Sequence, residues 1–322
     1  MTYHVLVPDN VHASAVDVLK AAGDALAYTA RGQITRDELL AEVANADALV
    51  IRSAHKIDKP VLDAAQNLKV IARAGVGVDN VDLAAATEKG VIVMNTPDGN
   101  TVSTAEHTLG LMLALARHIP QSHISMNEGK WDRKSYGGIE LRGKTLGLVG
   151  FGRIGRAVAK RALAFDMTVV TYDPYISAEQ AAAAGAAQVT LDELFAQSDF
   201  ISLHALLTDE TRDLVNKETI AKMKPGVRIV DAARGALINE ADLAEGLRSG
   251  QIAGAALDVY AQEPPDPNNP LIHLPNVVHT PHLAASTEDA QIVVAVEAAQ
   301  LVVDALLTGN YKNVVNPAAL GK

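Results

Sequence analysis

The chain has 322 residues, of which 48% are hydrophobic and 20% charged, the balance of an ordinary globular protein. At about 150 residues per domain, this length predicts two domains. The formal net charge of −10 argues against binding along a nucleic-acid backbone, which requires a cationic face. No cysteine is present, which excludes disulfides, thiolate metal sites and a cysteine nucleophile. Neither a basic leader nor an unbroken run of about 20 apolar residues is found, so we predict a cytoplasmic protein that binds neither nucleic acid nor membrane.

Short β-branched runs alternate with helical patterns along the first third of the chain. The predicted strands are residues 4–7, 48–51, 70–72 and 91–94. The predicted helices between them are residues 13–22, 36–45, 59–65 and 83–89. Strands interleaved with helices are typical of βαβ units, in which helices cover both faces of a parallel sheet.

The alternation restarts after a cluster of turn formers at residues 96–100. The second series of predicted strands is 144–149, 168–172, 200–203, 227–231 and 254–257. The predicted helices of this series are 154–165, 191–197, 217–223 and 240–249. Two such series predict two α/β domains with doubly wound parallel sheets.

Three further segments bear on the organisation of the domains. A long helix carrying Leu109, Leu111, Met112, Leu113 and Leu115 is apolar on nearly all sides, which predicts burial in the chain's own core or against a partner subunit. Six of the thirteen prolines fall between residues 264 and 281, which predicts loop and an edge strand. A last helix is predicted over residues 286–307, with Ser286 as its cap. Its predicted apolar stripe is Ile292, Val296, Ala299, Val303 and Leu306.

A glycine motif, Gly150-x-Gly152-x-x-Gly155, follows one predicted strand and opens a predicted helix. The next strand ends at Asp173, 18 residues after Gly155. This is the context of a dinucleotide fingerprint, in which glycines and a helix N-terminus receive the pyrophosphate. An aspartate there accepts hydrogen bonds from the ribose and repels a 2′-phosphate, so the motif predicts NAD rather than NADP. The alternative is a glycine-rich turn that binds no nucleotide.

Arg234, Glu263 and His282 each follow the end of a predicted strand in the second series. Open α/β sheets gather their ligands at this edge. Together the three residue types suit oxidation of a hydroxy acid: the arginine holds a carboxylate, the histidine takes the hydroxyl proton, and the glutamate stabilises the imidazolium. Spacing alone does not establish this, because any one of the ten histidines can be structural. The pair His279 and His282 could suggest a metal site, but no third ligand cluster accompanies it, so no metal is predicted.

With these motifs the chain resembles the D-2-hydroxyacid dehydrogenase family along nearly its whole length. The matching segments are 52–54, 73–82, 150–155, 233–235, 256–259, 263–265 and 281–283. The resemblance implies a Rossmann nucleotide-binding domain, residues 98–287, inserted in a flavodoxin-like lid domain made of residues 1–97 and 288–322. It also implies a homodimer or homotetramer, with the helix near residues 101–117 in the dimer interface.

The resemblance implies a role for each matching residue. His282 is the implied acid/base, Glu263 its partner and Arg234 the anchor of the substrate carboxylate. Arg153 and Ile154 would face the pyrophosphate, and Asp258 would meet the nicotinamide carboxamide. The implied lining of the cofactor site consists of Val76, Gly150, Gly152, Gly155, Asp173, Ala205, Ala232, Ala233, Arg234, His282 and Ala285.

The resemblance is strongest to the phosphoglycerate branch of the family. Arg52, Arg73 and Arg133 match its phosphate clamp, with Arg133 supplied by the neighbouring subunit. The other implied substrate-binding residues are Gly75, Val76, Arg234 and His282. The expected reaction is NAD-dependent oxidation of D-3-phosphoglycerate to 3-phosphohydroxypyruvate, the entry to serine synthesis, in a form without the family's regulatory domain.

Two alternatives remain open from the sequence. The arginines could lie in surface salt bridges, which would leave a glyoxylate or hydroxypyruvate reductase or another D-2-hydroxyacid dehydrogenase. Formate dehydrogenases are set aside because they carry glutamine where this chain has Glu263. A more remote alternative is an NAD-sensing corepressor of the same fold, which would bind partners rather than turn over a substrate.

Overall fold

The computed structural model describes residues 2–321, which form two compact units. Unit 1 runs as far as Asn100 and resumes at Ser286, and unit 2 is Thr101–Ala285. The boundaries predicted from the sequence were after residues 97 and 287. The second unit is therefore an insertion into the first.

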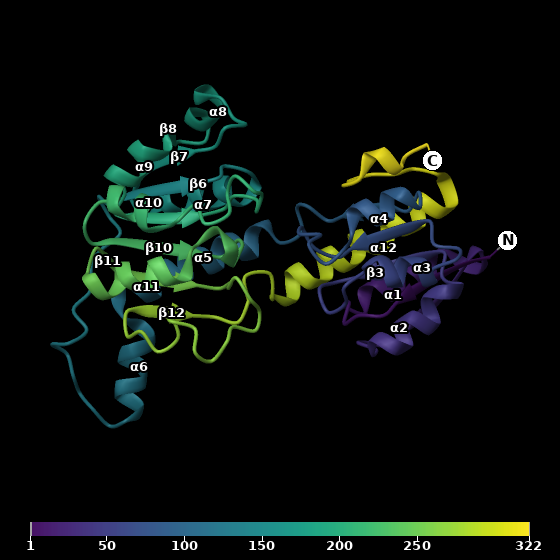
Figure 1. Ribbon diagram of the computed structural model, residues 1–322, viewed down its shortest axis with the longest axis horizontal. Coiled ribbons are helices and arrows are strands. Elements are labelled where there is room, and N and C mark those ends of the chain that lie inside the picture. Colours follow the sequence, from purple (N-terminus) through teal and green to yellow (C-terminus); the bar gives the residue numbers. More distant parts are fainter. Residues whose placement is uncertain (1, 322) are drawn as a thin grey trace. The chain divides into compact units, whose positions relative to one another are not determined.

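The sheet of unit 1 is parallel throughout, and its strand order is β2-β1-β3-β4-β5 (Figure 1). This is the order of flavodoxin-like sheets, which confirms the predicted fold class. Its strands are β1 (Tyr3–Val7), β2 (Leu26–Ala30), β3 (Ala48–Ile51), β4 (Val70–Arg73) and β5 (Ile92–Asn95). Strand β2 was not predicted, because it lies at the sheet edge and only its first residue is buried, which leaves a weak apolar pattern.

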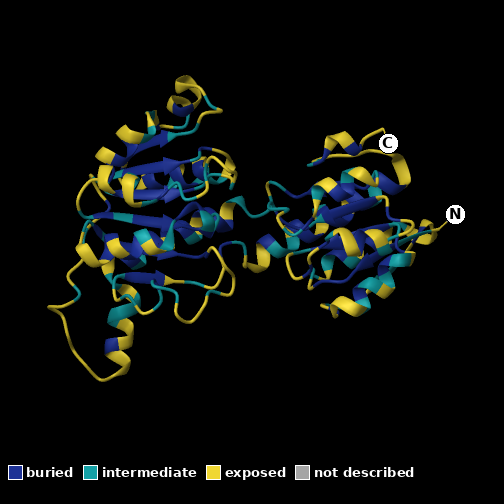
Figure 2. Cartoon of the chain, in the orientation of Figure 1, coloured by how far each residue is buried: buried dark blue, intermediate teal, exposed yellow. Residues whose placement is uncertain are grey.

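Helices cover both faces of this sheet and bury separate apolar clusters against it (Figure 2). The α-helices of unit 1 are α1 (Ser14–Ala21), α2 (Arg36–Glu42), α3 (Lys59–Ala64), α4 (Leu83–Glu88) and α12 (Glu288–Thr308). Single 3-10 turns are η1 (Gly23–Ala25), η2 (Val43–Asn45) and η4 (Pro317–Ala319). Side-chain caps place two helix starts: Thr35 accepts a hydrogen bond from Glu38 N at α2, and Asp58 from Val61 N at α3.

Helix α12 returns the chain to unit 1, where it packs on α1 and β4. The predicted cap of this helix was wrong, and its predicted apolar stripe was right at Ala299 and Leu306, which are buried. Its cap is Thr287, which accepts from Ala290 N, rather than Ser286. Its buried face centres on Val294, Ala298 and Val302, whereas Val296 is exposed, because a helix apolar over most of its circumference gives periodicity too little contrast.

Helix α12 is also long and apolar enough to cross a bilayer, although the sequence analysis found no such run. That search required an unbroken apolar stretch, and Gln291, Glu297 and Gln300 interrupt this one. Half of the segment is buried inside unit 1, as expected for a core helix of a globular domain.

The sheet of unit 2 is also parallel, in the order β12-β11-β10-β9-β6-β7-β8. Its strands are β6 (Thr145–Val149), β7 (Thr168–Tyr172), β8 (Ala187–Gln188), β9 (Phe200–Leu203), β10 (Val227–Asp231), β11 (Ile252–Leu257) and β12 (Val277–His279). Numbered from β6, the order is that of a Rossmann sheet with one added edge strand, and the strand order reverses between β6 and β9. The added strand, β12, lies in the proline-rich stretch where an edge strand was predicted.

Helices again cover both faces of the sheet. They are α5 (Thr101–Arg117), α6 (Ile119–Asn127), α7 (Arg153–Ala164), α8 (Ala178–Ala183), α9 (Leu191–Gln197), α10 (Lys217–Lys222) and α11 (Glu240–Ser249), with one 3-10 turn, η3 (Gly235–Leu237). Helix α5 packs on α7 and β11 and buries nine of its residues, so the chain's own core accounts for most of its apolar surface. Helix α6 and the loop after it extend away from the rest of unit 2 (Figure 1).

Candidate functional site

The turn between β6 and α7 is built from the glycine motif. Gly150 has φ +92, a left-handed conformation that favours glycine, and its N–H donates to Tyr172 O at 2.9 Å. A side chain on Gly155 would overlap the Gly150 carbonyl, so the helix packs against the turn only with glycine there. The turn is thereby fixed both to β7 and to the first turn of α7.

This turn fits the pyrophosphate of a dinucleotide. No atom lies within 4 Å of the position that a Cβ on Gly152 would occupy, so the backbone there is open to a ligand. Arg153 and Ile154 begin a twelve-residue helix, whose first N–H groups lack partners within the helix and carry its positive dipole. The Asp173 carboxylate accepts from Phe151 N at 2.7 Å and from Tyr175 N at 2.9 Å. It keeps further lone pairs for ribose hydroxyls.

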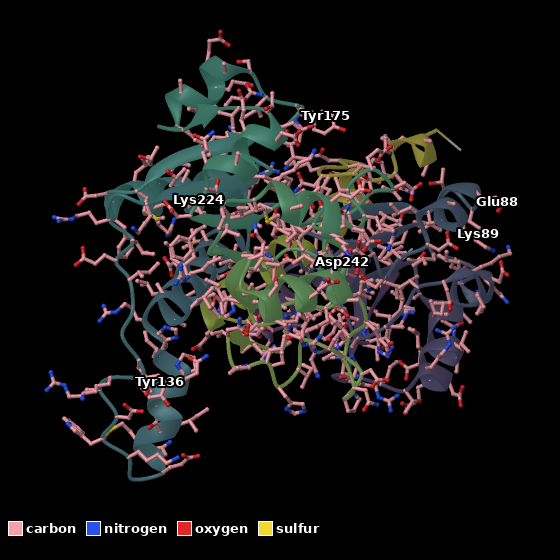
Figure 3. All side chains as sticks on the ribbon, turned by 60° about the vertical axis from the view of Figure 1, so that its left-hand side comes forward. Glu88, Lys89, Tyr136, Tyr175, Lys224 and Asp242 are labelled. Carbon is pink, nitrogen blue, oxygen red and sulfur yellow. The ribbon has the colours of Figure 1, made fainter. Side chains whose placement is uncertain are left out.

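His204 and Tyr175, two neighbours of this turn, were not predicted as site residues from the sequence. Burial lowers the pKa of His204 to about 4, so His204 is neutral and adds no positive charge beside the turn. Ala205 follows His204 after β9 and lies close to Gly150 after β6. The strand order reverses between these two strands. Tyr175 is 93% exposed beside Asp173, just beyond the end of β7 (Figure 3).

The register of the sheet places the remaining site residues of unit 2 along one edge. The last residues of five neighbouring strands form one row: Val149, Leu203, Asp231, Leu257 and His279. Ala232, Ala233 and Arg234 follow β10, Asp258 follows β11, and His282 and Ala285 follow β12. Parallel strands therefore bring together site residues that are more than fifty positions apart in the chain, from Ala232 to Ala285.

His282 and Glu263 form a hydrogen-bonded pair at this edge. Nδ1 of His282 lies 2.7 Å from Oε2 of Glu263, and the other carboxylate oxygen accepts from Tyr260 N at 3.2 Å. The hydrogen bond with Glu263 raises the pKa of His282. Burial favours the neutral acid, but the bond and charge of His282, the Tyr260 N–H and the charge of Arg234 together outweigh burial and hold the pKa of Glu263 below its usual value. About half of the His282 side chain is exposed, so a ligand can reach its other ring nitrogen, Nε2.

Arg234 precedes η3 and lies close enough to this pair for its charge to lower the pKa of both His282 and Glu263. Its Nη1 donates to Ala233 O at 2.6 Å. The structure thus brings the three predicted catalytic residues together: an anion-binding group beside a proton-accepting one.

A cavity of about 400 Å³ lies beside the pair. Its lining is Asp258, Tyr260, Glu263, Pro264, Pro265, Ile272, His279, Thr280, Pro281 and His282. His279 Nδ1 is hydrogen-bonded to the Tyr260 hydroxyl, so His279 and His282 take different partners. Among residues 2–321, no group of three or more His, Asp or Glu side chains is arranged to hold a metal.

Asp258, expected from the resemblance to meet the nicotinamide carboxamide, is buried and hydrogen-bonded within unit 2. Its side chain has no exposed surface and is hydrogen-bonded on both oxygens, to Leu283 N at 2.8 Å, Ala284 N at 2.9 Å and Thr280 Oγ1 at 2.5 Å. Burial raises its pKa, but hydrogen bonds led by that of His107 outweigh burial and bring the pKa to about 2. Asp258 is therefore a permanent carboxylate that holds the segment carrying His282.

The substrate residues predicted from the first third of the chain lie at the equivalent edge in unit 1. Arg52 immediately follows β3, and Arg73 ends β4, paired in register with Ile51. Asp9 accepts the backbone N–H of Arg52 at 2.9 Å. The guanidinium of Arg73 lies over Gly75, in the space that a Cβ on that glycine would fill. Val76 follows, with its carbonyl accepting from Asn95 Nδ2 at 2.6 Å.

Arg133 lies neither among the site residues at the sheet edge of unit 2 nor in unit 1 with Arg52 and Arg73. It is exposed in the loop after α6, beside a smaller hollow lined by Ser125, Trp131 and Tyr136, the last labelled in Figure 3. This protruding segment has an exposed apolar surface, with Trp131 78% and Ile124 57% exposed.

Sequence reasoning missed two further residues of unit 2, His107 and Asp231. His107 on α5 lies 3.2 Å from Asp258 through its Nε2, and a polar side chain on an otherwise apolar helix was the available signal. Asp231 is wholly buried at the end of β10, and burial raises its pKa to about 7. No pattern in the sequence marks a strand-end aspartate as buried.

The fold and the glycine turn define an NAD-binding oxidoreductase domain, and comparison with known proteins agrees. The family model described as "D-isomer specific 2-hydroxyacid dehydrogenase, NAD binding domain" matches residues 109–284. The chain belongs to this family, and NAD is its cofactor.

Individual relatives extend the likeness over nearly the whole chain. It is 49% identical over 312 residues to the D-3-phosphoglycerate dehydrogenase of Archaeoglobus fulgidus, covering 97% of this chain and 59% of that protein. The chain thus spans less than two thirds of the length of the curated relatives it matches. The TT0316 protein of Thermus thermophilus is 40% identical with a TM-score of 0.88, covering 97% of this chain and 99% of that one. The D-lactate dehydrogenase of Aquifex aeolicus, solved with NAD and lactic acid, is 27% identical with a TM-score of 0.84 and the same coverage.

Proposed function

We propose that this protein oxidises D-3-phosphoglycerate to 3-phosphohydroxypyruvate with NAD, the first step of serine synthesis. The observation that carries the reaction class is the bond between His282 Nδ1 and Glu263 Oε2 at 2.7 Å, with Arg234 beside it. The assignment of the substrate is supported by Arg52 and Arg73 and by the name that the curated relatives share.

The geometry supports the following proton-transfer roles. Because Nδ1 of His282 is bonded to Glu263, Nε2 is the nitrogen that takes the hydroxyl proton of the substrate. The imidazolium that forms is stabilised by the Glu263 carboxylate, while Arg234 binds the substrate carboxylate. The glycine turn would hold NAD, which would supply the acceptor for the hydride that leaves C2 as the alcohol becomes a ketone.

Arg52 and Arg73 would bind the phosphate. They extend from the carboxyl ends of neighbouring strands, and guanidinium groups bind phosphate oxygens bidentately. Glycerate or lactate has no group that would use them. The same fold in the Aquifex protein, solved with lactic acid, shows that the fold alone does not select the substrate.

We also infer that the protein is a homo-oligomer that acts in the cytoplasm. The segment from α6 through Trp131 carries exposed apolar side chains, including Ile119, Ile124 and Met126, that a second copy would cover. Arg133 lies on the same segment, so a partner subunit could present it to the phosphate.

The deciding experiment is NADH formation with D-3-phosphoglycerate, D-glycerate, D-lactate and D-2-hydroxyglutarate as alternative substrates. We expect kcat/KM to be highest for the phosphorylated acid. Preference for an unphosphorylated acid would keep the roles of His282 and Glu263 and refute the phosphate site. If none of the acids is oxidised although NAD binds, the enzymatic proposal fails.

A further inference from the structure

His282 is held in an unfavourable backbone conformation. Its φ is +54, in the left-handed region that non-glycine residues rarely adopt. Such a conformation persists only where surrounding contacts impose it. The contacts that impose it on His282 therefore contribute to the position of its imidazole.

Most of those contacts come from one residue, Asp258, although His282 N also donates to Thr280 O at 3.1 Å. Its backbone carbonyl accepts from His282 N at 2.8 Å, its Oδ1 from Leu283 N at 2.8 Å, and its Oδ2 from Ala284 N at 2.9 Å. Three consecutive N–H groups thus converge on Asp258 and hold the turn at His282. Because the Asp258 side chain is fully buried, these bonds form without competition from water.

The Asp258 carboxylate is in turn held from α5 by His107. Nε2 of His107 lies 3.2 Å from Asp258 Oδ1 and 3.1 Å from Thr280 Oγ1. The Thr280 hydroxyl, 2.5 Å from the same Oδ1, gives its only proton to the carboxylate. Nε2 therefore has no proton to accept, and the His107 tautomer is the one that carries N–H at Nε2 and donates to both oxygens.

We propose that His107 is a positioning residue for the acid/base histidine, acting through Asp258 and Thr280. It aligns the Asp258 carboxylate with the 282–284 turn, and the turn directs His282 Nδ1 at Glu263. His107 itself touches neither Glu263 nor His282 through any hydrogen bond among the described residues. The role assigned to His282 rests on the proposed function, whereas the network around it does not.

Two substitutions test the network, and two others control for them. His107→Leu removes the donor, and Thr280→Val removes the hydroxyl that shares its proton. His107→Gln restores an N–H donor on a side chain of similar reach. Glu106→Gln changes the neighbouring position of α5, whose carboxylate pairs with Arg161 on the surface at 3.1 Å.

The first readout is the titration of the His282 ring followed by ¹⁵N NMR, with the signal assigned by its loss in His282→Gln. We expect His107→Leu and Thr280→Val to lower the pKa of His282 towards its ordinary value, because the turn relaxes and the bond to Glu263 weakens. His107→Gln and Glu106→Gln should leave it where it is in the wild type. An unchanged His282 titration in both His107→Leu and Thr280→Val would overturn the inference.

The second readout is steady-state kinetics with whichever hydroxy acid the wild type oxidises best. We expect kcat to fall about 10- to 100-fold in His107→Leu, the scale for a displaced catalytic group, with a much smaller change in KM. His107→Gln should recover most of the loss. A change confined to KM, or to thermal stability, would make His107 merely structural. If the wild type oxidises no hydroxy acid, the proposed function fails, and the NMR titration alone still decides on the network.

Discussion

At the carboxyl edge of the sheet in unit 2, ionisable side chains are bonded to one another: Glu263 to His282, and Asp258 to His107. At the same edge of the sheet in unit 1, the prominent groups are two arginines, Arg52 and Arg73, on neighbouring strand ends. The fold is similar in both units, so the difference lies in the residues that follow the strands. A bonded acid–base network suits proton transfer, whose geometry must be set in advance, whereas cations at strand ends suit the binding of an anion.

The largest effect is expected at the acid/base histidine. His282→Ala should lower kcat about 10²- to 10⁴-fold, because proton transfer loses its acceptor. The dissociation constant of NAD should change little, since the dinucleotide turn lies at β6 and α7. NADH formation and NAD titration measure the two separately. Turnover at the wild-type rate would remove His282 from the mechanism.

The next largest effect distinguishes substrate binding at the edge of unit 1 from proton transfer at the edge of unit 2. Arg73→Gln should raise KM for D-3-phosphoglycerate about 10- to 100-fold. This corresponds to the loss of one charge-assisted hydrogen bond, which contributes about 1.5–3 kcal/mol. The kcat should change far less, because the acid–base pair is in the other unit. Arg36→Gln is the control, since Arg36 pairs with Asp58 on the surface of the same unit at 2.8 Å. Equal kinetics for both variants would assign Arg73 to structure.

The pH profile tests the pairing of Glu263 with His282. Oxidation needs neutral His282, and Glu263 raises the pKa of that histidine, so the wild-type rate should still be rising with pH above 6.5. In Glu263→Gln the rise should shift to lower pH, and the maximum kcat should be lower because the imidazolium loses its partner. The reverse reaction needs protonated His282, so its rate should fall with increasing pH. An unshifted profile in Glu263→Gln would mean that the titration belongs to another group.

The smallest effect concerns stability rather than rate. Burial raises the pKa of Asp231 to about 7, so the folded state binds its proton more tightly than the unfolded state. The contribution of Asp231 to the free energy of unfolding is favourable at low pH. It is lost as pH rises from about 4 to about 7, by up to about 1.4 kcal/mol per pH unit. Asp231→Asn should therefore gain stability relative to the wild type over that range. Thermal unfolding at several pH values measures it, with Asp209→Asn in an exposed loop as control.

Sequence reasoning succeeded where the determining interactions are local. The glycine turn could be predicted because a positive φ at Gly150 and close packing at Gly155 both require glycine within six residues. It was only partly right for α12, where Ala299 and Leu306 of the predicted stripe are buried but Val296 is exposed, because almost every face of that helix is apolar. It also missed β2, whose position at the sheet edge leaves most of its residues partly exposed.

The sequence by itself determined the fold class, the two α/β series and the dinucleotide motif, because periodicity and turn residues act between near neighbours in the chain. It also nominated Arg234, Glu263 and His282. Only the tertiary structure decided that Asp258 is buried beneath the His282 turn and that His107, from a helix more than 150 residues away, supports it. The physical reason is that parallel strand register and helix packing bring together side chains whose separation along the chain carries no signal.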